Sequence, residues 1–108
     1  MRELKNSGVK HNANDVVMIT KTPDGRLVWL EKGNNAAGLK HIEVRHASDL
    51  ASRGVTDIPG TLNRVMNTTP INTGSKAGGH FADFRYNGNV FRVVYGTNGY
   101  IVSFFPIQ

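Results

Sequence analysis

Two Asn-Gly pairs, Asn87-Gly88 and Asn98-Gly99, constrain the fold of this chain more than any other feature. Asn-Gly is the strongest short-range signal of a β-hairpin, because both residues tolerate the positive φ angles that a two-residue turn requires. The segments that flank the two pairs are rich in β-branched and aromatic residues, which favour strands. The sequence therefore predicts a three-stranded antiparallel meander, with strands at residues 80–86, 90–95 and 100–105.

A further hairpin is expected near the start of the chain. Apolar runs on either side of Pro23-Asp24-Gly25 predict a β-hairpin over residues 15–32. Proline fixes one backbone angle of such a turn, and glycine accepts a positive φ.

The region between the hairpin and the meander predicts two helices. Residues 36–53 carry apolar side chains at helical spacing, and this stripe consists of Leu39, Ile42, His46 and Leu50. A shorter helix fits residues 58–66, and a Gly-rich loop is expected at residues 67–79. The predicted class is α+β, with the N-terminal hairpin and two helices packed on the C-terminal three-stranded antiparallel meander.

Length and composition describe one domain. Residues 1–14 are polar and lack a period, so we expect a linker or flexible arm there, with the domain at residues 15–108. The chain has no cysteine, which excludes disulfides, a thiolate nucleophile and zinc–thiolate sites. No run of about 18 apolar residues occurs, so no membrane insertion is expected. The net charge of +5 favours an anionic partner such as nucleic acid.

Three residues on the first predicted helix, His41, Arg45 and His46, suit the cleavage of RNA. This reaction needs no metal or cofactor, because the 2′-hydroxyl of the RNA is itself the nucleophile. A protein has only to remove that proton, protonate the leaving 5′-oxygen and stabilise the charge on the phosphate. Two imidazoles titrate near neutrality and can perform the two proton transfers. A cation can stabilise the charge.

The predicted site draws on three parts of the chain. The expected catalytic residues are His41 and His46 as the acid–base pair, Arg45 and Lys76 as phosphate-stabilising cations, and Ser103. Thr97 and Tyr100 are expected to bind the substrate, Thr97 by positioning the phosphate and Tyr100 by stacking on a base. No metal is expected, because a helical His-Glu-x-x-His zinc site places its histidines four apart, whereas these two lie five apart.

Helical geometry leaves an alternative open for His46. Residues five apart on a helix are rotated by about 140°. His41 therefore shares a face with Arg45, whereas His46 falls on the apolar stripe and could be a buried core histidine. The mechanism with two imidazoles fails if the rings lie on opposite sides of the helix.

The stretch at residues 38–42 (GLKHI), followed by Arg45-His46, resembles the C-terminal toxin domains of contact-dependent growth inhibition and related polymorphic toxin systems. Residues 30–34 and 98–102 extend the likeness, which covers about residues 15–106. More broadly, the chain is similar to the barnase–EndoU–colicin–RelE superfamily of small ribonucleases. Residues 103–106 (SFFP) resemble the late Ser/Thr-x-Tyr-Pro of the EndoU branch, with Phe105 in place of the tyrosine.

The resemblance implies an α+β ribonuclease that needs no metal and often acts on tRNA. It implies delivery as part of a larger secreted or cell-surface effector, with action in the cytoplasm of the target bacterium. The implied partners are RNA, a cognate immunity protein and, for some of these toxins, a host translation elongation factor. In the EndoU branch two histidines and a lysine carry the reaction.

Two other functions remain open from the sequence. A non-catalytic basic module that binds nucleic acid or an acidic protein would lose its ligand steeply with salt and would not depend on either histidine. A deoxyribonuclease would require a divalent metal.

Overall fold

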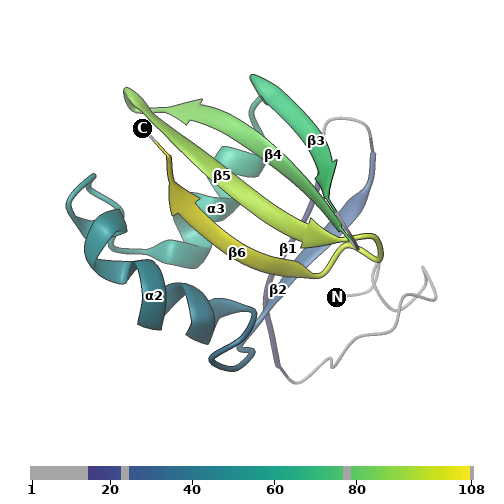
Figure 1. Ribbon diagram of the computed structural model, residues 1–108, viewed down its shortest axis with the longest axis horizontal. Helices are drawn as coiled ribbons and strands as arrows, with labels where there is room; N and C mark the ends of the chain where they lie inside the picture. Colours follow the sequence, from purple (N-terminus) through teal and green to yellow (C-terminus); the bar gives the residue numbers. More distant parts are fainter. Residues whose placement is uncertain (1–14, 23–24, 77–78, 108) are drawn as a thin grey trace.

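A four-stranded antiparallel sheet forms the centre of the molecule, with strand order β3-β4-β5-β6 (Figure 1). The computed structural model describes residues 15–22, 25–76 and 79–107. Its elements are β1 (Val16–Lys21), β2 (Leu27–Glu31), α2 (Leu39–Ala51), α3 (Ile58–Met66), β3 (Asn72–Lys76), β4 (Gly79–Tyr86), β5 (Asn89–Gly96) and β6 (Ile101–Pro106). The predicted α+β class is confirmed, as is the antiparallel pairing of β1 with β2. The expected arm at residues 1–14 and the turn residues Pro23 and Asp24 lie outside the described residues.

The predicted meander is present as β4, β5 and β6, but Asn98 lacks the positive φ expected of it, and Tyr95 pairs with Ile101 across a connection longer than two residues. Asn87 and Gly88 adopt φ angles of 52° and 81°, the left-handed conformation that the two-residue turn demands. This turn fixes the register of β4 against β5, so that Tyr86 pairs with Asn89 and Asp83 with Arg92. Between β5 and β6 the register shifts once, at Val94/Tyr95.

The prediction of a loop at residues 67–79 was wrong. Asn72–Lys76 forms β3, and the sheet has four strands rather than three. The five residues NTGSK carry little β propensity. Their strand forms by pairing with β4, and the ring of Phe81 lies across Gly74. A Cβ atom at Gly74 would meet that ring at 2.5 Å, so glycine permits the close packing.

The first helix is shorter than predicted, and the second has the predicted bounds. Residues 34–37 form a tight turn in which the Asn34 side-chain oxygen accepts hydrogen bonds from the backbone N–H groups of Ala36 and Ala37. Gly38 follows with a φ of 88°, so α2 begins only at Leu39. At the start of α3 the Asp57 carboxylate accepts a hydrogen bond from the Gly60 N–H, which is an N-cap.

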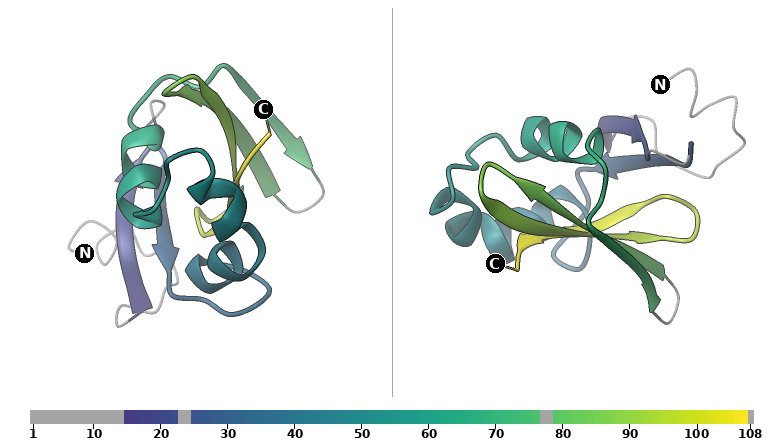
Figure 2. Two further views of the ribbon diagram at one scale, coloured as in Figure 1. Left: turned by 90° about the vertical axis from the view of Figure 1, so that its left-hand side faces the viewer. Right: turned by 90° about the horizontal axis from the view of Figure 1, so that it is seen from above.

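The core lies on one face of the four-stranded sheet. Helix α3 and the β1–β2 hairpin cover that face, while α2 runs beside the edge strand β6 (Figures 1 and 2). The largest fully buried side chains are Trp29, Phe84, Phe91 and Phe104. In the described ranges no helix or strand covers the opposite face, which we call the open face (Figure 2). Neither described helix has the length and apolar character that crossing a membrane requires.

Candidate active site

Helix α2 is attached to β6 at its first residues. The Gly38 N–H donates a hydrogen bond to the Val102 carbonyl oxygen at 3.0 Å. A Cβ atom at Gly38 would lie 2.9 Å from the Glu31 carbonyl oxygen and 3.1 Å from the Tyr100 hydroxyl. Only glycine therefore allows this close approach, and it sets the next turns of α2 alongside β6.

This attachment brings the two predicted imidazoles together. The ring centroids of His41 and His46 lie 5.6 Å apart, with the ring planes at 81°. The His46 ring also stacks on Phe105 of β6, with centroids 5.0 Å apart and planes 28° apart. The rings are thus on the same side of the helix despite the angle between their Cα positions.

His46 lies at the border of the apolar stripe rather than inside the core. Ile42 and Leu50 are fully buried and Leu39 packs against the core, whereas both His41 and His46 are half-buried. The alternative of a sealed core histidine is therefore wrong. Both imidazoles retain an accessible part that a ligand can reach.

The surroundings distinguish the two rings chemically. The His41 Nδ1 atom lies 3.0 Å from the Asn35 carbonyl oxygen. Because a carbonyl oxygen only accepts hydrogen bonds, Nδ1 carries a hydrogen in this contact. Burial lowers the pKa of His46 below its ordinary value; nearby His41 and Arg45 lower it further, against the opposing effect of Asp49. His46 therefore favours the neutral form.

Ser103 lies next to this pair along β6. The register places Ser103 opposite Val94 and Phe105 opposite Arg92, so the two side chains share one face of the strand. Ser103 is only 5% exposed, and its hydroxyl finds no hydrogen-bond partner among the described residues. A buried hydroxyl without a partner costs about 1–3 kcal/mol.

Of the other predicted site residues, Arg45 lies near the imidazole pair, and the rest lie elsewhere on the molecule. Arg45 is exposed and adjoins His46, and Tyr100 is half-buried with its ring edge-on to Trp29. Thr97 is exposed in the turn between β5 and β6. Lys76 ends β3, at the edge of the sheet opposite β6, so two strands, β4 and β5, separate its backbone from the strand beside the imidazole pair.

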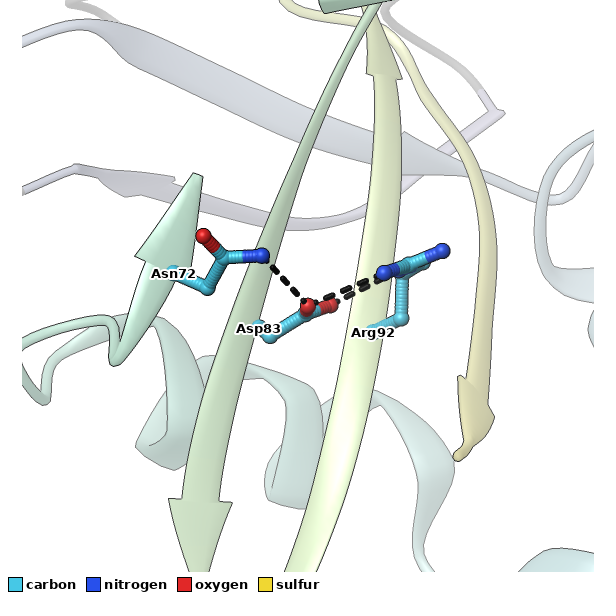
Figure 3. A network of polar contacts seen from close by, with 3 residues as sticks. All are labelled: Asn72, Asp83 and Arg92. Atoms are coloured by element: carbon cyan, nitrogen blue, oxygen red, sulfur yellow. Dashed lines mark hydrogen bonds and ion pairs between the residues drawn. The ribbon is translucent and has the colours of Figure 1, made fainter. Parts of the chain in front are cut away.

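Sequence reasoning missed a fixed cation on the open face. Two nitrogens of the Arg92 guanidinium donate to the two Asp83 carboxylate oxygens at 2.8 and 3.0 Å, and the Asn72 amide donates to the same carboxylate at 3.3 Å (Figure 3). The third guanidinium nitrogen of Arg92 points away from Asp83 (Figure 3). Arg92 also lies over the Phe81 ring, 4.2 Å from its centroid, a cation–π contact.

A signal for this pair was present in the sequence. A two-residue turn at Asn87-Gly88 places residues at equal distance from it opposite each other, and this pairs Asp83 with Arg92. Arg92 also pairs with Phe105 of β6, the residue on which His46 stacks, while its guanidinium is held against Asp83 and Phe81 of β4. The Arg92 side chain therefore extends the candidate site across the sheet.

A third histidine lies at the other edge of the sheet. His80 begins β4, and its Nδ1 atom lies 3.1 Å from the Ser75 hydroxyl of β3. Both residues line an open cavity of about 210 Å³, and the His80 ring is tilted against Tyr95. This cavity is separate from the imidazole pair on α2.

Among the described residues, no group of three or more His, Cys, Asp or Glu side chains is placed to hold a metal ion. A comparison with models of protein families found no match, and neither did a search of curated proteins.

Proposed function

We propose that this protein is an endoribonuclease that cleaves RNA without a metal ion, with His41 and His46 as its acid–base pair. The observation that carries the proposal is the contact between these two imidazoles, 5.6 Å apart at their centroids and partly accessible. Two imidazoles with different surroundings match a reaction in which one group removes a proton while another donates one. The resemblance to toxin domains of the barnase–EndoU–colicin–RelE superfamily supports the same activity.

His46 is assigned the role of general base. Its lowered pKa keeps the ring neutral near pH 7, so it can accept the proton of the 2′-hydroxyl. The 2′-oxygen then bonds to phosphorus, the bond from phosphorus to the 5′-oxygen breaks, and protonated His41 donates a proton to that oxygen. The products are a 2′,3′-cyclic phosphate and a free 5′-hydroxyl.

The remaining residues stabilise charge and position the substrate. Arg45 is an exposed cation that adjoins His46 in the chain, and Arg92 is a second cation fixed by Asp83. Ser103, two residues before Phe105 on β6, is proposed to take part in positioning the phosphate, although its hydroxyl is buried in this structure. Lys76, Thr97 and Tyr100 are proposed to contact the RNA farther from the scissile bond, which suits their positions at the other sheet edge and at the β5–β6 turn.

The biological setting is proposed on the resemblance alone. The domain would act as an antibacterial toxin of contact-dependent growth inhibition, carried by a larger secreted or cell-surface effector. Its substrate would be tRNA in the cytoplasm of the target bacterium. A cognate immunity protein would neutralise it, and a translation elongation factor is a further proposed partner.

The chemistry can be tested directly on the RNA. The purified protein is incubated with bacterial tRNA in the presence of EDTA, the cleavage position is mapped, and the new ends are analysed. We expect a 2′,3′-cyclic phosphate and a 5′-hydroxyl, and no cleavage of an oligonucleotide with a 2′-deoxy residue at that position. Cleavage of the deoxy substrate, or a strict need for a divalent metal, would contradict the proposal. Binding of RNA without any cleavage would instead support a non-catalytic module.

A further inference from the structure

A small cavity of about 90 Å³ lies between the end of α2, helix α3 and the β4–β5 turn. The hydrogen-bonding side chains that line it are those of Arg53, Thr61, Arg64, Tyr86 and Asn87. No carboxylate in the described ranges lines the cavity. Two guanidinium groups together with hydroxyl and amide groups form a lining suited to an anion.

The cavity is partly organised before any ligand binds. One terminal nitrogen of Arg53 donates to the Asp49 carbonyl oxygen at 3.1 Å and to the Ser52 hydroxyl at 3.2 Å. Ser52 in turn donates to the Asp49 carbonyl oxygen at 2.7 Å. The other N–H groups of this guanidinium keep donor capacity, because arginine carries five in a fixed fork. Arg64, in the last turn of α3, is exposed and adds a second guanidinium.

The size of the cavity restricts what it can hold. It is several times larger than the ~10–15 Å³ that one water molecule needs. It is far smaller than the ~300–1,000 Å³ of pockets for drug-sized ligands. A single phosphate group is an anion that fits both the volume and the lining.

The cavity lies just past the C-terminal end of α2, the helix that carries the imidazole pair. Arg53 follows His46 by about two helical turns, a rise of about 10 Å along the helix axis. An RNA strand held at the imidazoles would thus pass within reach of the two arginines.

We propose that this cavity binds a phosphate group of the RNA substrate, at a position removed from the bond that is cleaved. The inference rests on the proposed ribonuclease function. It assigns Arg53 and Arg64 as substrate-binding residues that do not take part in the chemical step.

Binding can be measured separately from cleavage by working with the His41→Ala variant. Fluorescence anisotropy with a labelled single-stranded RNA gives the Kd over a series of salt concentrations. Adding Arg64→Gln should weaken binding by about 5- to 10-fold and lower the salt slope by about one unit, since one phosphate contact is lost. Arg64 is exposed, so the thermal melting temperature should hardly change.

Arg85→Gln is the matched control, because it removes the same charge from an exposed strand position outside the cavity. We expect less than about a 2-fold change in Kd for this variant, from the loss of long-range attraction alone. Equal effects of Arg64→Gln and Arg85→Gln would overturn the phosphate site. Such a result would leave the ribonuclease proposal intact. If the wild-type protein instead binds RNA without cleaving it, the ribonuclease proposal is wrong, but the phosphate site is not affected.

The source of the phosphate is distinguished by NMR. The arginine side-chain signals of Arg53 and Arg64 are followed during titration with the RNA and, separately, with inorganic phosphate. Shifts with the RNA support the proposal, whether or not free phosphate also causes them. Shifts with inorganic phosphate alone would overturn it, because the cavity would then bind a free anion rather than the nucleic acid.

Discussion

The two edges of the four-stranded sheet each carry histidine, yet they present it in different ways. At the β6 edge, α2 covers the strand and places two imidazoles against each other and against Phe105. At the β3 edge, a single imidazole, His80, meets the Ser75 hydroxyl beside an open cavity. At the β6 edge, partial burial and the neighbouring His41 ring lower the pKa of His46, and no second imidazole stands beside His80 among the described residues.

The largest expected effect is the loss of RNA cleavage when a histidine at the β6 edge is replaced, compared with replacement of His80 at the β3 edge. His41→Ala and His46→Ala should each lower the rate of RNA cleavage by about 10²- to 10⁴-fold, the usual worth of a general acid or base. His80→Ala should leave the rate within about 3-fold. Single-turnover cleavage of the mapped tRNA measures all three variants. If His80→Ala is as damaging as the other two, the assignment to the β6 edge is wrong.

Asp83 on β4 ties the edge strand β3 to the inner strand β5, and its removal should loosen the β3 edge. Asp83→Asn removes the ion pair with Arg92, whose side chain is 24% exposed, and should lower the free energy of unfolding by about 2 kcal/mol. Hydrogen exchange should increase most in β3, because Asn72 also loses its partner. Urea unfolding and exchange measured by NMR test both expectations. Faster exchange confined to β6 would contradict this role.

The ion pair of Asp83 with Arg92 should make the free energy of unfolding fall as the pH is lowered. The hydrogen bond from Arg92 lowers the pKa of Asp83 below its ordinary value. The stabilisation is therefore complete above the unfolded pKa, near 4, and is lost as the pH falls toward the lower folded pKa. The stability difference between wild type and Asp83→Asn should shrink over that range.

Titration should test the coupling of the two imidazoles at the β6 edge. By NMR, His46 should titrate below the ordinary value of about 6.5, and His41→Gln should move its pKa upward because the neighbouring positive charge is gone. The folded pKa of His46 is lowered, so its contribution to stability is present above about pH 6.5 and is lost as the pH falls toward the folded value. His46→Gln should reduce that acid sensitivity. An unchanged His46 titration in His41→Gln would contradict the coupling.

The smallest expected effect concerns Ser103. Ser103→Ala removes a buried hydroxyl without a partner among the described residues, so stability should rise or stay within about 1 kcal/mol. Activity should nevertheless fall, because the hydroxyl would no longer meet the phosphate. Ser75→Ala at the other edge is the control and should leave cleavage unchanged. A loss of stability in Ser103→Ala without a loss of activity would indicate a structural role.

Local signals predicted most of the fold. The Asn87-Gly88 turn fixed two strands and their register, and α3 has the predicted bounds because Asp57 and Pro59 mark its start. Strand β3 could not be predicted, since its residues form a strand only through pairing with β4 and contact with Phe81.

The candidate site was predictable only in part. The residue types on α2 indicated the chemistry, but helical rotation alone separated His41 from His46. Their contact depends on side-chain directions and on Phe105, which comes from a distant part of the sequence. The pairing of Asp83 with Arg92 followed from the turn, yet their presence on the same face as Phe105 required the register of the next hairpin as well.

The stacking of His46 on Phe105 has a consequence for folding. The loop between these residues must close before the ring contact exists, and this closure opposes folding through the entropy of the chain. A partly folded state in which β6 is undocked would hold a complete α2 and still lack the reactive centre. Catalytic competence should therefore appear in the same cooperative step as β6 docking, so that refolding followed by enzymatic assay and by tertiary fluorescence gives one shared time course.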